Sequence, residues 1–190
     1  KTYLEELKFK LDMNFELTSE GKVNDNCPEE FYLEIIDEPL SKKDTNDDVW
    51  KTYDLYLLSI LLPTTACKKI GYNCYNVMST FPKNAWILHG LWPTYKNGSI
   101  PGWCHGDNDI EVEKKNNTLY NYMNTYWQSI YTSNERTWAH EYNRHGYCYN
   151  KKLELDVYDY DQYFMKSVEL YKKYDLANIF INMFKNRDIK

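Results

Sequence analysis

The sequence predicts an α+β domain in which a small antiparallel sheet carries several packed helices. Apolar and aromatic residues run almost without interruption through 50–62 and 85–89, as in buried strands. Apolar side chains recur at three- and four-residue steps in 119–131 and 158–174, which predicts amphipathic helices. The 190 residues contain no internal repeat, so we expect one domain of ordinary size and a monomer.

The other elements follow from local patterns. Leucine and phenylalanine at three- and four-residue steps predict a helix at 3–15. Ser133 can cap a further helix, 133–145, which Gly146 is expected to stop. We also expect a loop at 19–26, a strand at 31–36, a charged linker at 39–48, loops at 67–74 and 95–106, and a last helix at 175–184.

Composition and charge exclude two classes of protein. Hydrophobic residues make up 43 % of the chain, but no run reaches the ~20 apolar residues of a membrane-spanning helix. The net charge is −5, whereas a protein that holds nucleic acid tightly and without sequence preference is usually basic. An enzyme that holds a few nucleotides in a cleft remains compatible with this charge.

Cysteines and glycosylation sequons indicate an oxidising compartment. Asn97 and Asn116 each begin an Asn-X-Ser/Thr sequon. The cysteines lack the repeated short spacing of a zinc site, and together with the sequons they favour a secreted or endolysosomal protein. The first residues lack the features of a signal peptide, so we expect any such segment to have been removed. The five cysteines are Cys27, Cys67, Cys74, Cys104 and Cys148.

Two segments contain three of the four histidines of the chain. The first, WILHGLWP at 86–93, brings His89 to the end of an apolar run. The second, TWAHEYNRHGYC at 137–148, is expected to be helical, and residues four apart on a helix are neighbours on one face. We therefore expect both segments to meet in one cleft. The helical candidates are His140, Glu141, Arg144 and His145.

Two histidines on either side of a phosphate can cleave RNA without a metal ion or other cofactor. One imidazole takes the proton of the ribose 2′-hydroxyl, and the other protonates the leaving 5′-oxygen. A nearby cation and a further donor stabilise the extra negative charge on the phosphate. Because the 2′-hydroxyl is the nucleophile, DNA is expected to be inert.

Other interpretations of these residues remain open. Each histidine alone fits a structural hydrogen bond, and the helical residues fit a solvated face with ion pairs. A zinc site is the sharper alternative, but His145 follows His140 by five residues, not the four of HEXXH. His105 is interpreted as structural. Trp92 and Pro93 fit either a core cap with a rigid turn or a wall on which a base stacks.

At these residues the sequence strongly resembles the ribonuclease T2 family. The segments 86–93 and 138–148 are similar to its first and second active-site segments, and the likeness extends over about 50–189. The resemblance implies that family's fold and an endoribonuclease that cuts single-stranded RNA. It also implies 2′,3′-cyclic phosphate ends first and 3′-phosphate ends after hydrolysis.

The resemblance assigns a role to each site residue. His145 resembles the base that deprotonates the 2′-hydroxyl, and His89 resembles the acid that protonates the leaving group. His140 resembles the phosphate-binding histidine, and Glu141 the group that stabilises the pentacovalent state. Arg144 stands where the family usually has lysine, and it remains a cation. The substrate-binding residues implied are Trp92, Pro93 and Thr94.

Two departures from the family concern base recognition. The family often has an acidic residue directly after the motif, where this chain has Thr94, so a purine preference resting on that acid is not implied. The family often has tryptophan before a proline where this chain has Leu62, which removes one nucleobase contact.

The resemblance further implies the disulfides Cys67–Cys74 and Cys104–Cys148. The second would join the loop after the first motif to the end of the second motif. Cys27 is left without its family partner. On the sequence alone, other pairings remain open.

The ends of the chain depart from the family, whose members continue past the position matching Lys190 with a helix, a cysteine and a strand. Similar pieces occur near the start, with a helix-like match at 3–7 and a strand-like match at 32–35. We therefore predict a circular permutation, with an unrelated N-terminal extension as the alternative. We expect the strand at 31–36 to join the sheet and Lys1 to lie near Lys190. In this arrangement 1–40 resembles the family's C-terminal part, 41–49 is a linker, and 50–190 resembles its N-terminal and central part.

The alternative function is a secreted ribonuclease-like effector that acts mainly by binding a receptor or glycan. Loss of catalysis in such a protein would usually remove site residues, whereas all of them are present here. The sequence therefore favours the enzyme.

Overall fold

The computed structural model describes part of the chain. The described residues are 6–11, 13–16, 52–63, 66–67, 85–96, 100–101 and 110–175. The predictions for 19–26, 31–36, 39–48 and the helix beyond Asp175 lie outside these residues, as do Lys1, Lys190, Cys27 and His105. In the described part, no helix has the length and apolar character needed to cross a membrane.

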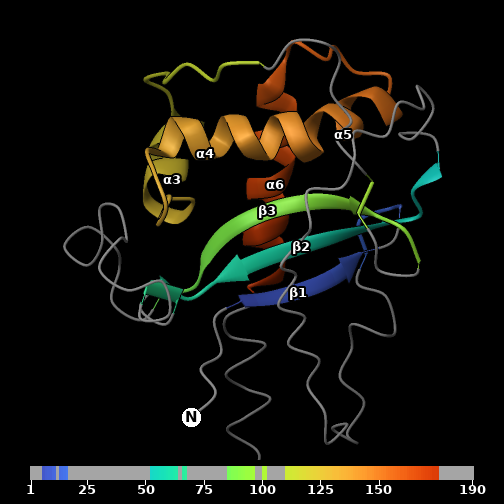
Figure 1. Cartoon of the computed structure of the whole chain (residues 1–190), viewed down its shortest axis with the longest axis horizontal. Helices are drawn as coiled ribbons and strands as arrows, with labels where there is room; N and C mark the ends of the chain where they lie inside the picture. The colour runs from blue at the N-terminus through green and yellow to red at the C-terminus, as the bar shows by residue number, and fades with distance from the viewer. Residues whose placement is uncertain are drawn as a thin grey trace, which may run out of the picture.

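Within the described residues, three antiparallel strands form the sheet, in the order β1-β2-β3 (Figure 1). They are β1 (Glu6–Leu11), β2 (Leu55–Leu61) and β3 (Ile87–Thr94). The central strand β2 pairs with both neighbours, and helices pack on the sheet, so the predicted α+β fold is confirmed. The expected strand at 85–89 is longer than predicted and continues to Thr94.

The predicted helix at 3–15 is wrong, because Glu6–Leu11 is a strand. The segment ELKFKL also alternates apolar and charged residues, a period of two that suits an edge strand with one covered face. Pairing with β2 supplies backbone hydrogen bonds along the whole strand, from Glu6 opposite Leu61 to Leu11 opposite Tyr56. The helical spacing of the leucines was therefore coincidental.

The turn after β1 is also attached to the domain. The ring of Phe15 stacks on that of Tyr56 with centroids 4.9 Å apart. The Tyr174 hydroxyl donates to the Phe15 carbonyl at 2.6 Å, and Lys173 Nζ lies 2.7 Å from Glu16 Oε1. Strand β1 and this turn thus belong to the same packed unit as the rest of the described chain.

Five helical elements follow β3 in the described part of the chain. They are α3 (Thr118–Tyr126), α4 (Asn134–Glu141), the π-helical turn η1 (Tyr142–Gly146), α5 (Tyr147–Lys152) and α6 (Tyr160–Tyr174). The helix predicted at 133–145 forms, but Gly146 does not stop it. The backbone runs through η1 directly into α5.

Local signals explain where the helices begin and end. Ser133 caps α4 as predicted, its hydroxyl accepting from the Arg136 amide at 3.3 Å. The Asn117 side chain caps α3 in the same way, accepting from the Tyr120 amide at 3.0 Å. Helix α6 ends at Asp175, which has a left-handed backbone with φ of 37°.

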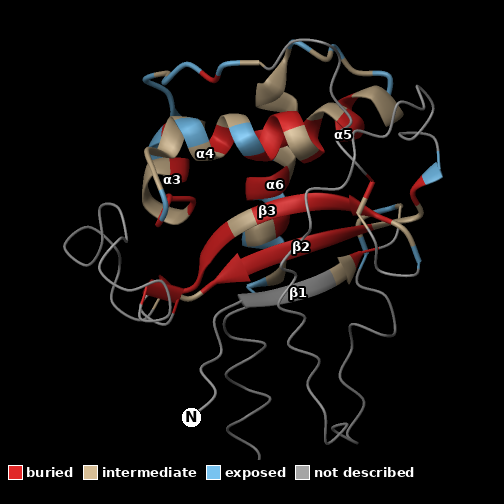
Figure 2. Ribbon diagram, viewed as in Figure 1, coloured by how far each residue is buried: buried red, intermediate tan, exposed pale blue. Residues whose placement is uncertain are grey.

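The core lies between the sheet and α6, and aromatic side chains fill much of it. Helix α6 contacts β2, β3, η1, α3 and α5, and Figure 1 shows it crossing behind the strands. Strands β2 and β3 are buried along almost their whole length (Figure 2). This packing fixes the strand that carries His89 against the helices that carry the second motif. The largest fully buried side chains include Trp127, Trp138, Tyr56, Tyr120, Tyr142, Tyr163 and Phe164.

Candidate active site

His89 occupies a β-bulge in β3. Ser59 of β2 pairs with Gly90, whereas the next residue of β2, Ile60, pairs with Leu88. His89 is therefore the extra residue of the bulge. A bulge redirects a side chain out of the regular alternation of a strand, and bulges are common beside active sites. The His89 side chain remains 23 % exposed although most of β3 is buried.

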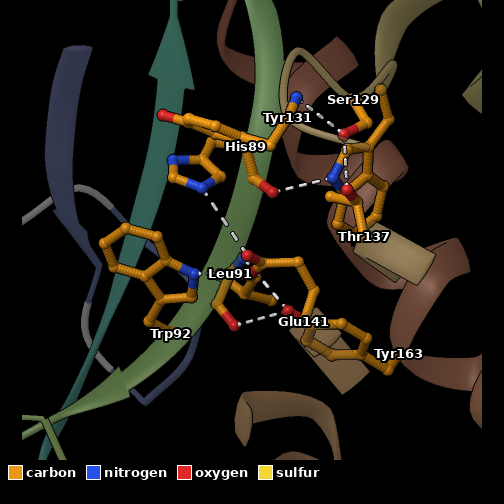
Figure 3. A network of polar contacts seen from close by, with 9 residues as sticks. His89, Leu91, Trp92, Ser129, Tyr131, Thr137, Glu141 and Tyr163 are labelled. Atoms are coloured by element: carbon orange, nitrogen blue, oxygen red, sulfur yellow. Dashed lines mark hydrogen bonds and ion pairs between the residues drawn. The ribbon is translucent and has the colours of Figure 1, made fainter. Parts of the chain in front are cut away.

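Glu141 of α4 lies between two side chains of β3 (Figure 3). Its Oε2 accepts a hydrogen bond of 2.8 Å from the indole nitrogen of Trp92. Its Oε1 lies 3.6 Å from Nε2 of His89, and the carboxylate side chain is only 3 % exposed. A buried carboxylate requires such partners, because an isolated charge is costly to remove from water.

His145 of η1 reaches the same tryptophan from the helical side. Its ring stacks on Trp92 with centroids 5.2 Å apart and planes at 27°. The ring of His89 meets Trp92 edge-on, with centroids 5.1 Å apart and planes at 79°. Both predicted acid/base histidines therefore contact one indole, although 56 positions separate them in the printed sequence (145 − 89 = 56).

Gly90 permits the close approach of the strand and Glu141. A Cβ atom on Gly90 would overlap Oε2 of Glu141 and would lie 2.5 Å from the indole nitrogen of Trp92. No real side chain tolerates such contacts, so the glycine that follows His89 is a steric requirement of the site.

The turn η1 places His145 in the buried layer. The amide of Tyr147 donates to the carbonyl of Tyr142, five residues earlier, which defines the π-helical turn. Gly146 is needed here because a Cβ atom would overlap Tyr142 and lie 2.7 Å from the ring of Tyr163. π-Helical turns inside α-helices are frequent at functional sites.

Asn143 ties η1 to the segment before α3. Its Oδ1 accepts from the amide of Ile110 at 2.8 Å, and its Nδ2 donates to the carbonyl of Ile110 at 2.8 Å. One side chain thus saturates both backbone groups of a residue in a non-repetitive segment. This clamp was not predicted, because asparagine alone carries no sequence signal for a distant backbone partner.

The two remaining predicted helical residues differ in exposure. His140 is exposed on α4, one residue before the buried Glu141. Arg144 is half-buried in η1, one residue before the buried His145. Burial lowers the pKa of the Arg144 guanidinium from its usual 12.5, which leaves it charged at neutral pH. Glu141 and His145 are thus buried, whereas His140 and Arg144 are more exposed.

The residues predicted to bind substrate are buried in this chain. Trp92 is engaged with Glu141 and His145, as described above, and Pro93 is buried beside it. The Thr94 hydroxyl donates to the carbonyl of Trp92 at 3.0 Å, and its own carbonyl accepts from Asp54 at 3.1 Å. A role of these three residues in base binding remains a prediction.

The described residues include some of the predicted disulfide cysteines and one of the two glycosylation sequons. Cys67 and Cys148 are both disulfide-bonded. Their predicted partners, Cys74 and Cys104, lie outside the described residues, as does Asn97. Asn116 is exposed just before the cap of α3. Among the residues that can be described, no three His, Cys, Asp or Glu side chains gather as a metal site would require.

The site brings together the imidazoles of His89 and His145 and the buried carboxylate of Glu141, and the cation Arg144 precedes His145 in η1. Imidazoles exchange protons near neutral pH, and the cation and carboxylate can stabilise and orient charge. Sequence reasoning found these groups but missed Gly90, Asn143 and the bulge. The HG pair after the apolar run was the available signal for Gly90.

Comparisons with known proteins identify the family of the chain. A model of the Ribonuclease T2 family matches residues 53–188. Ribonuclease Rh of Rhizopus niveus is 34 % identical over an alignment covering 52 % of this chain and 47 % of that protein. Human Ribonuclease T2 is 29 % identical, covering 64 % of this chain and 43 % of that protein. Ribonuclease T2 of Aspergillus oryzae is 34 % identical, covering 50 % and 38 %.

The chain therefore spans less than half the length of these curated relatives. The family match nevertheless covers both histidine segments and every described element from β2 to α6. The site lies wholly inside the matched region. By this match the chain belongs to the ribonuclease T2 family.

Proposed function

We propose that this chain is a metal-independent endoribonuclease that cleaves single-stranded RNA. The observation that carries the proposal is the contact of His89 and His145 with the same indole, that of Trp92. The two imidazoles come from different elements, and a shared ring between them sets their separation. Such a pair suits concerted proton transfer to and from one phosphodiester.

In the proposed first step, His145 takes the proton of the ribose 2′-hydroxyl, and the 2′-oxygen attacks phosphorus. The bond from phosphorus to the 5′-oxygen breaks, and protonated His89 gives its proton to that oxygen. The products are a 2′,3′-cyclic phosphate and a free 5′-hydroxyl. In the second step water replaces the alcohol, the proton transfers reverse, and a 3′-phosphate results.

The charged residues around the pair fit the needs of this reaction. The half-buried Arg144 supplies positive charge for the phosphate oxygens, and His140, four residues earlier, is a further hydrogen-bonding group. Glu141 keeps its orientation through Trp92 and lies beside His89, where a carboxylate favours the protonated imidazole. An acid that starts protonated is what the leaving 5′-oxygen requires.

The substrate class follows from the nucleophile. DNA lacks the 2′-hydroxyl and cannot form the cyclic phosphate, so we propose that it is not cut. Single-stranded RNA exposes its backbone and bases to a protein cleft more fully than a duplex does. The net charge of −5 suits a few local contacts better than a long electrostatic track.

The test is digestion of single-stranded RNA in excess EDTA at acidic pH. We expect cleavage by the parent protein, a 2′,3′-cyclic phosphate intermediate, and no cleavage of DNA of the same sequence. His89→Ala and His145→Ala should each lower kcat by at least about a hundredfold. RNA left intact by the folded parent protein would overturn the proposal, and cleavage that EDTA abolishes would transfer it to a metal enzyme.

We further propose that residues 1–40 occupy the place of the family's C-terminal part. The family model matches only 53–188, yet β1 completes one edge of the sheet by pairing along all of β2. The contacts of Phe15 and Glu16 with α6 support the same integration. Because Glu6–Leu11 is a strand, the helical match at 3–7 does not support the proposal, which rests on the pairing of β1 with β2.

We also propose that the protein acts as a monomer in a secretory or endolysosomal compartment. The disulfide-bonded state of Cys67 and Cys148 fits an oxidising environment, with Cys74 and Cys104 as their proposed partners. The exposed Asn116 is accessible to glycosylation. Peptide mapping without reduction, after expression in a secreting host, tests both features.

A further inference from the structure

Side chains from the helical part hydrogen-bond to the backbone of β3. Within the described residues, β3 has a neighbouring strand on one side only, that of β2. An exposed strand edge leaves backbone donors and acceptors without a ladder, and proteins cover such edges. Here three aromatic residues bond to β3 and its approach. They are Trp127, Tyr163 and Tyr171.

Trp127 holds the bulged residue itself. Its indole nitrogen donates a 2.7 Å hydrogen bond to the carbonyl of His89. Trp127 is in turn fixed from α4, because its carbonyl accepts from the indole of Trp138 at 2.8 Å. Trp138 precedes Glu141 by one helical turn, so a chain of two hydrogen bonds connects the helix of Glu141 with the backbone of His89.

Tyr163 of α6 holds the strand two residues further on. Its hydroxyl accepts from the amide of Leu91 at 3.3 Å and donates to the carbonyl of Leu91 at 3.0 Å (Figure 3). Burial, together with the nearby Glu141 carboxylate, raises the pKa of Tyr163 well above its usual value, so the hydroxyl keeps the proton that it donates. The same ring rests against Gly146, the residue after His145.

These hydrogen bonds matter because the bulge interrupts the pairing of β3 with β2 on the opposite edge of the strand. His89 is the extra residue of the bulge, where the regular ladder between β2 and β3 is interrupted. The bonds from Trp127 and Tyr163 act on His89 and on Leu91, flanking the glycine that admits Glu141. A shift of this short stretch would change the 3.6 Å separation of His89 and Glu141.

We propose that Trp127 and Tyr163 are positioning residues that fix the bulged His89 for its acid/base step. They touch neither substrate nor reacting atoms and act through the backbone of β3. The inference rests on the proposed ribonuclease function for its kinetic consequence, but the positioning itself can be observed without any reaction.

The main variant is Tyr163→Phe, which removes one hydroxyl and keeps the ring against Gly146. Trp127→Phe removes the indole donor. The matched control is Tyr171→Phe, because the Tyr171 hydroxyl also donates to a backbone carbonyl of the same chain segment, that of Trp86 at 2.6 Å. Trp86 precedes β3 and lies outside the bulge, so the control loses a similar bond without releasing His89.

In the RNA assay we expect Tyr163→Phe and Trp127→Phe to lower kcat about tenfold, because small misplacements of a catalytic group are costly. KM should stay within about twofold of the parent value, since no substrate contact is removed. The alkaline limb of the kcat–pH profile, along which the general acid His89 loses its proton, should move in both variants. Tyr171→Phe should lose thermal stability as Tyr163→Phe does but retain kcat and the pH profile.

A second readout is the imidazole NMR signal of His89, assigned by its absence in His89→Asn. Tyr163→Phe and Trp127→Phe should shift this signal in the folded protein, and Tyr171→Phe should leave it in place. An unchanged signal and unchanged kcat in folded Tyr163→Phe would overturn the inference. If the parent protein cuts no RNA, the proposed function fails, whereas the NMR comparison still decides the positioning.

Discussion

The indole nitrogen of Trp92 lies 2.8 Å from Oε2 of Glu141, so a tryptophan of β3 donates a hydrogen bond to a buried carboxylate of α4. This contact joins the two histidine segments of the chain at their centre. The other carboxylate oxygen lies beside His89, and the face of the indole carries His145. One tryptophan therefore sets the position of three charged or titratable groups.

Trp92→Phe should impair both stability and activity. The substitution keeps an aromatic face for His145 but leaves Oε2 of the buried Glu141 without its indole donor. An unsatisfied buried charged group costs about 1–3 kcal/mol or more, which urea unfolding can measure. We expect kcat on RNA to fall about tenfold or more, because Glu141 and His145 are no longer positioned by contacts with the same indole.

A double-mutant cycle with Glu141→Gln isolates the contact. If the indole acts through the carboxylate, the stability losses of Trp92→Phe and Glu141→Gln should not add in the double variant. Strict additivity of the two losses in unfolding free energy would show that Trp92 stabilises the protein independently of Glu141.

Gly90→Ala should damage the site more than its single methyl group suggests. The new Cβ would overlap Oε2 of Glu141, so strand and helix must separate or the carboxylate must turn away. We expect kcat to fall about a hundredfold, as for a misplacement of about 1 Å, together with a lower thermal midpoint. RNA cleavage assays and thermal unfolding measure the two effects.

A shorter carboxylate provides the control for this clash. Adding Glu141→Asp to Gly90→Ala should recover part of the lost thermal stability, because the carboxylate withdraws from the new methyl group. Activity should not recover, since the contact with Trp92 is stretched. A double variant less stable than Gly90→Ala alone would contradict the steric explanation.

The sequence was sufficient for two strands of the core and for the helix that begins the second histidine segment. Apolar runs predicted β2 and β3, and the segment 133–145 was predicted to be helical, as α4 and η1 are. Ser133 predicted the start of α4, because serine is a preferred residue at the N-cap of a helix. These features depend on residues close together in the chain, which is why local patterns reveal them.

The remaining features depend on contacts distant in sequence. Strand β1 is a strand because β2 pairs with it, and this partner outweighs a helical spacing of leucines. The bulge at His89 is a matter of register between two strands, which no single strand encodes. Tyr163 is one of 19 tyrosines, and only the fold distinguishes it from the others.

Leu11→Ala tests whether β1 is an integral part of the domain. Leu11 is completely buried and lies opposite Tyr56 of the central strand. Removal of a buried leucine side chain typically costs about 2–5 kcal/mol. Leu153→Ala is the matched control, because Leu153 is 39 % exposed after α5. Equal urea midpoints for both variants would mean that β1 adds little to the stability of the fold.

Buried tyrosines should make the protein sensitive to alkaline pH. Burial raises the pKa of Tyr56 to about 12, and burial likewise raises the pKa of Tyr53, whose hydroxyl lies 2.8 Å from that of Tyr56. Burial also raises the pKa of Tyr120, Tyr142, Tyr149, Tyr163 and Tyr171.

A tyrosine whose pKa is higher in the folded than in the unfolded chain binds its proton more tightly when folded. Its contribution to stability is therefore complete below the unfolded pKa of about 10 and is lost as pH rises above it. Because the pKa of several tyrosines is raised by folding, their losses of stabilising free energy add, and the protein should unfold cooperatively above about pH 10.

Tyrosinate absorbance and circular dichroism should then change in one transition. In Tyr158→Phe, which removes a phenol that is 77 % exposed, the transition should keep its midpoint. Complete ionisation of all tyrosines while the circular dichroism remains native would contradict the burial on which the sign depends.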